Sequence, residues 1–176
     1  MQPESFGGQK DVKEGTEEAL RATKKQGLQQ LLEQLETSVK ALTKSRDDTR
    51  EMAKDAPSAN QSHSDTSKFQ LSNLQLSLDA SRLETEKTIF LLQKTPLNRC
   101  DKIALGAIFT IREVASESMG ETYFLVSAGG GEEITLENIN VVSITPGAPL
   151  VRACLHKNKG DTFVFMGKKF EITSIV

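Results

Sequence analysis

Apolar residues recur along this chain in two different rhythms, and the rhythm changes near residue 96. The first rhythm follows alternating four- and three-residue steps through Leu28, Leu32, Leu35, Val39 and Leu42. This spacing is typical of one face of a coiled-coil helix. The same register continues through Arg46, Thr49, Ala53 and Ala56, so towards residue 56 this face carries small or polar side chains in place of large apolar ones. The pattern predicts a long helix that begins near Thr16 and packs against another helix.

A second apolar row predicts a second helix, which begins at Asp65 or Thr66 and runs to about Lys94. The row consists of residues spaced seven apart, namely Phe69, Leu76, Leu83 and Phe90. Leu74, Leu78 and Ile89 widen it. The segment 55–66 is rich in turn-forming residues. Two helices joined by a short turn form an antiparallel hairpin. At ~1.5 Å per residue its arms would be roughly 40–60 Å long.

Beyond Pro96, which cannot continue a helix, the residues alternate between apolar and polar as strands do. We expect strands at 103–114, 123–126, 140–144, 161–165 and 170–175. A glycine-rich turn spans 127–133, and one or two helical turns span 149–155. The predicted class is α+β: a long N-terminal antiparallel helical hairpin (coiled coil), followed by a small antiparallel β domain with a short helix. We divide the chain into a flexible leader (1–15), the hairpin (16–95, tip near 55–66) and the β domain (100–176).

Composition excludes several classes of protein. The 176 residues carry 22 basic and 24 acidic side chains, and a net charge of −2 argues against binding of free nucleic acid. No apolar run approaches the ~20 residues of a membrane span, and the N-terminus lacks the features of a signal peptide. We therefore expect a soluble, cytoplasmic protein with no membrane partner. Cys100 and Cys154 have neither zinc-site nor redox spacing, and Cys154 lies in an apolar stretch that suits the core.

Four segments of the C-terminal part follow one another in a characteristic order. They are Ile103–Phe109, Tyr123–Val126, Ser143–Leu155 leading into His156–Asp161, and Phe170–Ile175. This order, preceded by a helical hairpin, resembles the Gre family of bacterial transcript-cleavage factors, and the match is strongest over residues 103–176. The family's C-terminal domain is similar to the FKBP-like fold.

The resemblance implies a function on RNA polymerase. In the family the C-terminal domain docks outside the polymerase, and the hairpin enters its secondary channel. Carboxylates at the tip then help to hold Mg²⁺ at the polymerase active site, which hydrolyses backtracked RNA by two-metal chemistry. The factor is accordingly an accessory protein and not an enzyme, with no cofactor of its own. It meets nascent RNA and DNA only within the elongation complex, and we expect it to be a monomer.

The tip of this chain departs from the family pattern of an Asp and a Glu three residues apart. The nearest acids are Asp55 and Asp65, one on each arm, and both are candidate catalytic carboxylates, with Asp65 a candidate metal ligand. Asp65 is equally explained as the N-cap of the second helix. Other candidate contacts to the polymerase are a basic cluster near the tip and an apolar turn in the β domain, comprising Arg46, Arg50, Lys54, Lys68, Pro146, Pro149 and Leu150. The basic cluster also suits a solvated helix face.

Several functions stay open at this point. The protein stimulates transcript cleavage through an altered tip, or it occupies the channel and regulates transcription without cleavage. A peptidyl-prolyl isomerase with a helical arm follows from fold analogy alone. A purely structural coiled-coil dimer explains the first rhythm but not the second domain, although heptads serve pairing within and between chains equally well.

Overall fold

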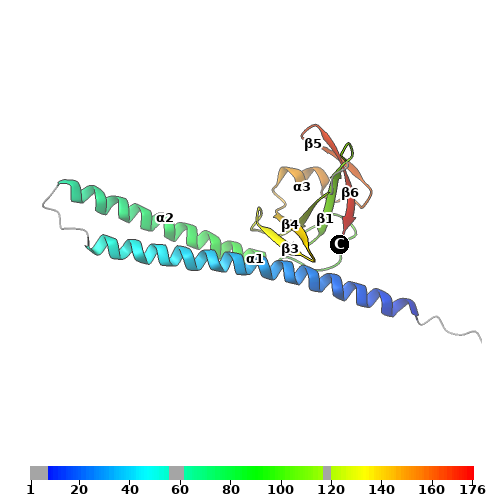
Figure 1. Ribbon diagram of the computed structural model, residues 1–176, viewed down its shortest axis with the longest axis horizontal. Coiled ribbons are helices and arrows are strands. Elements are labelled where there is room, and N and C mark those ends of the chain that lie inside the picture. The colour runs from blue at the N-terminus through cyan, green and yellow to red at the C-terminus, as the bar shows by residue number, and fades with distance from the viewer. Residues whose placement is uncertain (1–7, 56–61, 117–119) are drawn as a thin grey trace, which may run out of the picture. The chain divides into compact units, whose positions relative to one another are not determined.

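The chain forms an α+β structure with two compact units (Figure 1). The computed structural model describes the backbone of residues 8–55, 62–116 and 120–176, and the side chains of residues 18–54, 68–116 and 120–176. One unit contains the chain up to Leu31 and from Leu92 onward, and the other is the helix pair between Leu32 and Leu91. The predicted fold class is confirmed. None of the described helices is long and apolar enough to cross a membrane.

Both long helices begin earlier than the sequence predicts. Helix α1 (Gly8–Asp55) starts eight residues before Thr16, so residues 8–15 are helical where a flexible leader was expected. Helix α2 (Ser62–Leu92) starts before Asp65 and ends two residues short of Lys94. The polar start of α1 carries no apolar periodicity, which is why the sequence pattern does not extend the helix to it. Residues 1–7 of the expected leader, and 56–61 of the expected tip, lie outside the described residues.

The two helices of the second unit lie side by side and bury the predicted row of α1 (Figure 1). Leu35 and Thr49 are buried, and the positions between them in the same register are half-buried: Val39, Leu42 and Arg46. Thr49 is accommodated because its hydroxyl donates to the carbonyl of Ser45, 2.7 Å away. The seam of α1 is therefore confirmed, including its polar end.

The apolar row of α2 in which residues recur every seven positions faces away from α1, and not towards it as expected. Phe69, Leu76, Leu83 and Phe90 are all more than half exposed. The half-buried row of α2 instead contains Leu71, Leu78, Arg82 and Ile89. Seven-residue spacing identifies an apolar row, but it does not say which of two rows meets the neighbouring helix. In the packed row, Asp79 reaches the charge of Arg46 on α1, and its carboxylate also lies 3.8 Å from Arg82 Nε.

The other unit contains a single six-stranded sheet with the order β3-β4-β2-β1-β6-β5. Its strands are β1 (Ile108–Glu113), β2 (Glu121–Leu125), β3 (Glu133–Leu136), β4 (Ile139–Ile144), β5 (Thr162–Phe165) and β6 (Lys168–Ile175). All neighbours pair antiparallel except β2 and β4, which pair parallel with Thr122 opposite Val141. The sheet is therefore mixed, and not wholly antiparallel as predicted. The parallel pair arises because the β3–β4 hairpin folds back and places β4 beside β2.

Strand β3 was not predicted, because its four residues follow directly on the glycine-rich turn. Its pattern alternates all the same, with Ile134 and Leu136 buried and their neighbours exposed. Glu137 and Asn138 then connect it to β4, with φ values of 48° and 67°. Two consecutive positive φ values form the tight turn that matches the twist of paired strands.

The core of the sheet unit lies beneath helix α3 (Pro149–Cys154). Leu150, Val151 and Cys154 of this helix pack with buried residues of the strands and their leading segment, namely Ile103, Phe109, Ile111, Leu125, Phe163 and Ile172. Cys154 is thus a core residue, as predicted. The first predicted strand is shorter than expected, because residues 104–107 form a turn in which Gly106 has a φ of +86°.

Gly106 lets the segment after α2 pack closely on the sheet unit. A Cβ atom at this position would lie 2.0 Å from the carbonyl oxygen of Pro96. We therefore expect Gly106→Ala to lower the free energy of unfolding of this unit by about 3 kcal/mol, from the clash and the positive φ together. Urea unfolding followed by the fluorescence of Tyr123, the single tyrosine in a chain without tryptophan, measures the change.

Gly147→Ala is the matched control, because no atom lies within 4 Å of the added Cβ. We expect it to change stability by no more than about 0.5 kcal/mol. Equal stability of the two variants would show that the Pro96 carbonyl is not held against Gly106.

Candidate functional site

The candidate tip carboxylates lie near the ends of the two helices that flank residues 56–61. Asp55 is the last residue of α1, and Asp65 is in the first turn of α2, which begins at Ser62. Asp65 is therefore not the N-cap of the helix, contrary to one of its predicted explanations. The side chains of both residues lie outside the described set, so whether they converge stays a prediction. Among the described residues, no three His, Cys, Asp or Glu side chains are grouped so as to hold a metal ion.

The basic cluster of the hairpin divides into two kinds of residue. Arg50 and Lys54 are exposed on the last turns of α1, and Lys68 is half-buried on α2. Arg46, in contrast, lies in the seam between the helices. Arg50 and Lys54 are thus accessible to a partner, whereas Arg46 has a role within the hairpin.

Arg46 is part of an ionic chain that joins the two helices. Its Nη2 lies 2.7 Å from Asp47 Oδ1, and its Nη1 lies 3.5 Å from Asp79 Oδ1 on α2. Asp79 also faces Arg82, whose Nη1 lies 2.6 Å from Glu86 Oε1. The hydrogen bonds that Arg46 donates to Asp47, with a smaller contribution from Asp79, raise the pKa of Arg46 above its ordinary value. A polar seam of this kind joins the arms where few apolar side chains are available.

The predicted apolar patch of the β domain is only partly exposed. Pro146 and Pro149 are exposed, and Pro149 begins α3 at a position where its missing N–H is not needed. Leu150, however, is 8% exposed and belongs to the core, so it cannot serve as a contact residue as predicted. The short helix turns every third or fourth residue inwards, and the linear sequence around Pro149 does not show which side chains these are.

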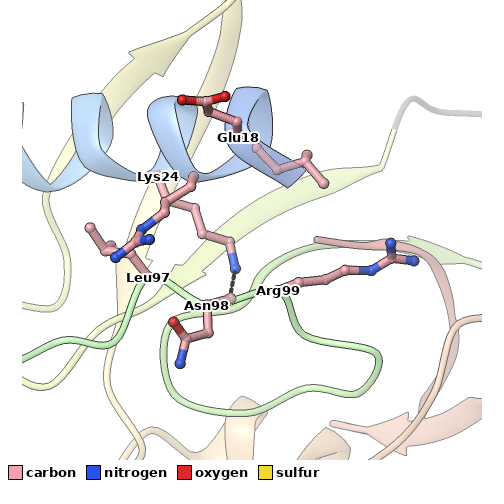
Figure 2. Close-up of a pocket in the computed structure, with 7 residues that line it drawn as sticks. Glu18, Lys24, Leu97, Asn98 and Arg99 are labelled. Atoms are coloured by element: carbon pink, nitrogen blue, oxygen red, sulfur yellow. Dashed lines mark hydrogen bonds between the residues drawn. The ribbon is translucent and has the colours of Figure 1, made fainter. Parts of the chain in front are cut away.

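A hollow of about 340 Å³ lies where α1 meets the segment that follows α2, within the sheet unit. Its walls are formed by Glu18, Leu20, Arg21, Lys24, Leu97, Asn98 and Arg99. Figure 2 shows the side chain of Lys24 extending from α1 to this segment, where its Nζ donates a hydrogen bond to the carbonyl oxygen of Asn98 at 2.6 Å. The Cys100 thiol lies 3.9 Å from the same nitrogen.

Lys24 is 1% exposed, which is unusual for a lysine. Burial lowers its pKa below the ordinary value of 10.5, and the nearby Cys100 partly offsets this effect. Because its ammonium donates to the Asn98 carbonyl, Lys24 has a structural role: it holds α1 to the segment that follows α2. Burial also raises the pKa of the Cys154 thiol to about 11, which makes this cysteine unreactive at neutral pH.

The same stretch of α1 covers edge strand β3. The Gln30 side chain donates to the carbonyl of Thr135 at 3.0 Å and accepts from its N–H at 3.3 Å. Gly27 allows the close approach, since a Cβ there would lie 3.1 Å from the Ile134 side chain. Sequence reasoning missed Lys24, Gly27 and Gln30; the isolated glycine inside a helical pattern is the signal that could have indicated a packing contact.

Comparison with known proteins adds a structural likeness. No family model matches the chain, and no curated protein matches its sequence. The crystal structure of Thermus aquaticus Gfh1 is similar at 18% identity, over 88% of this chain and 94% of that one, with a TM-score of 0.33. GreA factor homolog 1 (Gfh1) of Thermus thermophilus is similar at 16% identity, over 85% and 94%, also with a TM-score of 0.33.

The buried ammonium of Lys24 predicts a pH-dependent stability. The unfolded chain binds this proton up to pH 10.5, whereas the folded chain releases it at lower pH. Between the two pKa values the unfolded state binds more protons, so the free energy of unfolding rises with pH across this window. For each pKa unit by which folding lowers the pKa of Lys24, the free energy of unfolding changes by about 1.4 kcal/mol across the window. Lys24→Met removes this contribution, so the stability of the wild type relative to the variant should rise as pH approaches 10.5.

Urea unfolding followed by circular dichroism, from neutral pH to pH 10.5, measures this difference. Lys25→Met is the matched control, because it removes an adjacent but exposed lysine of the same helix. The control should keep the pH slope of the wild type. A Lys24→Met variant with that same slope would contradict the prediction.

Proposed function

We propose that this protein is a Gre-type transcription factor that binds RNA polymerase and inserts its helical hairpin into the secondary channel. The observation that carries the proposal is the order of the parts: a two-helix hairpin, followed by a domain whose β1, β2, β4–α3 and β6 segments contain the Gre-like sequence motifs. The arms are long and thin. From Leu32 to Asp55, α1 measures roughly 36 Å at ~1.5 Å per residue.

In this proposal the polymerase carries out the chemistry and the factor contributes ligands. Asp55 and Asp65 are the acids nearest the tip, one from each arm, and carboxylate oxygens are the ligands that Mg²⁺ prefers. A bound Mg²⁺ would activate water for hydrolysis of backtracked RNA. The exposed Arg50 and Lys54 would contact the channel wall or the nascent RNA.

A second candidate function is regulation of transcription without cleavage. It is supported by the spacing of the acids, which are ten residues apart and on different helices, instead of three apart on one segment. A hairpin that fills the channel but supplies no ligand would block the entry of backtracked RNA. Both functions need the same docking on the polymerase and differ in whether the RNA is cleaved, so one cleavage experiment separates them.

The test is RNA cleavage in a deliberately backtracked elongation complex, with polymerase from the same source and Mg²⁺ present. For a cleavage factor, we expect the wild type to shorten the transcript and Asp65→Ala to slow this at least about tenfold, because a ligand is lost. Asp55→Ala shows whether the other arm contributes. Asp48→Ala is the control, because it removes an exposed acid from the same helix as Asp55.

Competition with an authentic cleavage factor completes the test. Absence of cleavage together with full competition would assign the second function. If the protein neither cleaves nor competes at saturating concentration, the proposed binding to polymerase is wrong.

A further inference from the structure

Lys24 and Cys100 meet at one backbone carbonyl, although they are 76 positions apart in the chain. The Lys24 ammonium donates to the carbonyl oxygen of Asn98 at 2.6 Å, as Figure 2 shows, and the Cys100 thiol donates to the same oxygen at 3.5 Å. The Nζ and Sγ atoms are themselves 3.9 Å apart. A basic nitrogen from α1 and a sulfur from the segment that follows α2 are thus held next to each other within the sheet unit.

The surroundings of Lys24 favour a neutral amine more than those of an ordinary lysine do. The residue is 1% exposed, and burial lowers its pKa. Among the residues whose side chains are described, only Cys100 raises this pKa again, and no carboxylate contributes. The neutral amine is the nucleophilic form of a lysine, because its nitrogen then has a free lone pair.

Cys100 differs from Cys154 in its access to solvent. Cys154 is buried in the core, whereas Cys100 is half-buried. The two residues that precede it, Asn98 and Arg99, line the hollow described above. A small oxidant reaches a thiol with solvent access more readily than one in the core. The first product of such oxidation is a sulfenic acid, which condenses with a neighbouring thiol or nitrogen.

We propose that Cys100 is a site of oxidation by hydrogen peroxide, and that its oxidised sulfur then forms a covalent bond with Lys24 Nζ. Lysine has a flexible four-carbon side chain, so Nζ can leave the Asn98 carbonyl and close the 3.9 Å gap to the sulfur. The reaction takes place inside one chain. It does not depend on the proposed function or on a partner.

The reaction has two steps, and the peroxide is its only oxidant. In the first, a bond forms between the Cys100 sulfur and a peroxide oxygen, the O–O bond breaks, and water leaves behind a sulfenic acid. In the second, the lone pair of Lys24 Nζ attacks the sulfur and the S–O bond breaks. The departing hydroxide takes a proton from the nitrogen and becomes water. The thiol and the amine together lose two electrons and two protons, and the peroxide is reduced to water.

The bond would join α1 covalently to the segment that follows α2, where the reduced protein has a hydrogen bond. A cross-link restricts the unfolded chain, and it does so more strongly when the loop that it closes is long. The midpoint of urea unfolding should therefore rise after oxidation. It should return to its first value when dithiothreitol reduces the S–N bond.

Peptide mapping of the full chain after treatment with excess hydrogen peroxide tests the proposal. Trypsin does not cut after a modified lysine, so we expect residues 22–25 to be linked to residues 100–102. The linked pair should be lighter than the two peptides together by two hydrogen atoms, because a thiol and an amine have been joined. The intact protein should keep the mass of one chain, 19.3 kDa. Dithiothreitol should remove the linked pair.

Lys24→Met should abolish the linked peptide. Its Cys100 should proceed to sulfinic and sulfonic acid, because no amine traps the sulfenic acid. Lys25→Met is the matched control, since it removes the adjacent but exposed lysine, and it should cross-link like the wild type. Circular dichroism shows whether each variant keeps its helices. The mapping of the wild type needs no variant, so the test holds even if Lys24→Met does not fold.

Several results would overturn the proposal. One is a wild type in which Cys100 stays a thiol, or becomes sulfinic or sulfonic acid, with no linked peptide. Another is a disulfide of Cys100 with Cys154 or with a second chain, because a thiol and not the Lys24 amine would then have reached the sulfenic acid. A link from Cys100 to Lys25 would contradict the geometry on which the proposal is based.

Discussion

The sheet unit depends on one buried ammonium group. Lys24 projects from α1 and bonds to the Asn98 carbonyl, so the first part of the long helix is tied to the segment that follows α2. In that segment the carbonyl of Pro96 packs closely against Gly106 of the sheet unit. The Thr95 hydroxyl is also hydrogen-bonded to the Ser127 hydroxyl, with the two oxygens 3.0 Å apart. A buried charge is tolerated only when it is bonded, so neither helix nor segment can shift without leaving the ammonium unpartnered.

The hairpin is joined by a different kind of contact. Its seam begins with leucines and ends with Thr49, and the two arms are linked by Arg46 and Asp79 in place of a thick apolar core. The threonines in and beside this seam satisfy their hydroxyls within the helix, as Thr43 does by donating to the Val39 carbonyl at 2.8 Å. In this packing Phe69, Leu76, Leu83 and Phe90 of α2 stay exposed, whereas Leu71, Leu78 and Ile89 of the same helix are half-buried. The polar contact that joins the two arms and the exposed apolar row of α2 therefore both follow from the way in which α2 packs on α1.

Part of the candidate site was evident from the chain alone. The seam of α1, the acids on both sides of the tip and the basic residues Arg50 and Lys54 follow from spacing and residue type. The buried state of Leu150 and the structural role of Arg46 do not, because exposure depends on which neighbours fold over a residue. Gln30 is the clearest omission. A glutamine on a polar helix face gives no indication that it will bond to both backbone groups of Thr135.

The sequence by itself determined that this protein has two long helices, then a sheet with a short helix, because periodicity and the glycines and prolines act locally. It also determined the path of the α1 seam, which is encoded in regular three- and four-residue steps. Only the tertiary structure decided which row of α2 faces α1, that β4 pairs parallel with β2, and that Lys24 is buried. Each of these depends on competition between surfaces far apart in the chain. Local pattern identifies a surface able to pack, and the energy of all the contacts together selects its neighbour.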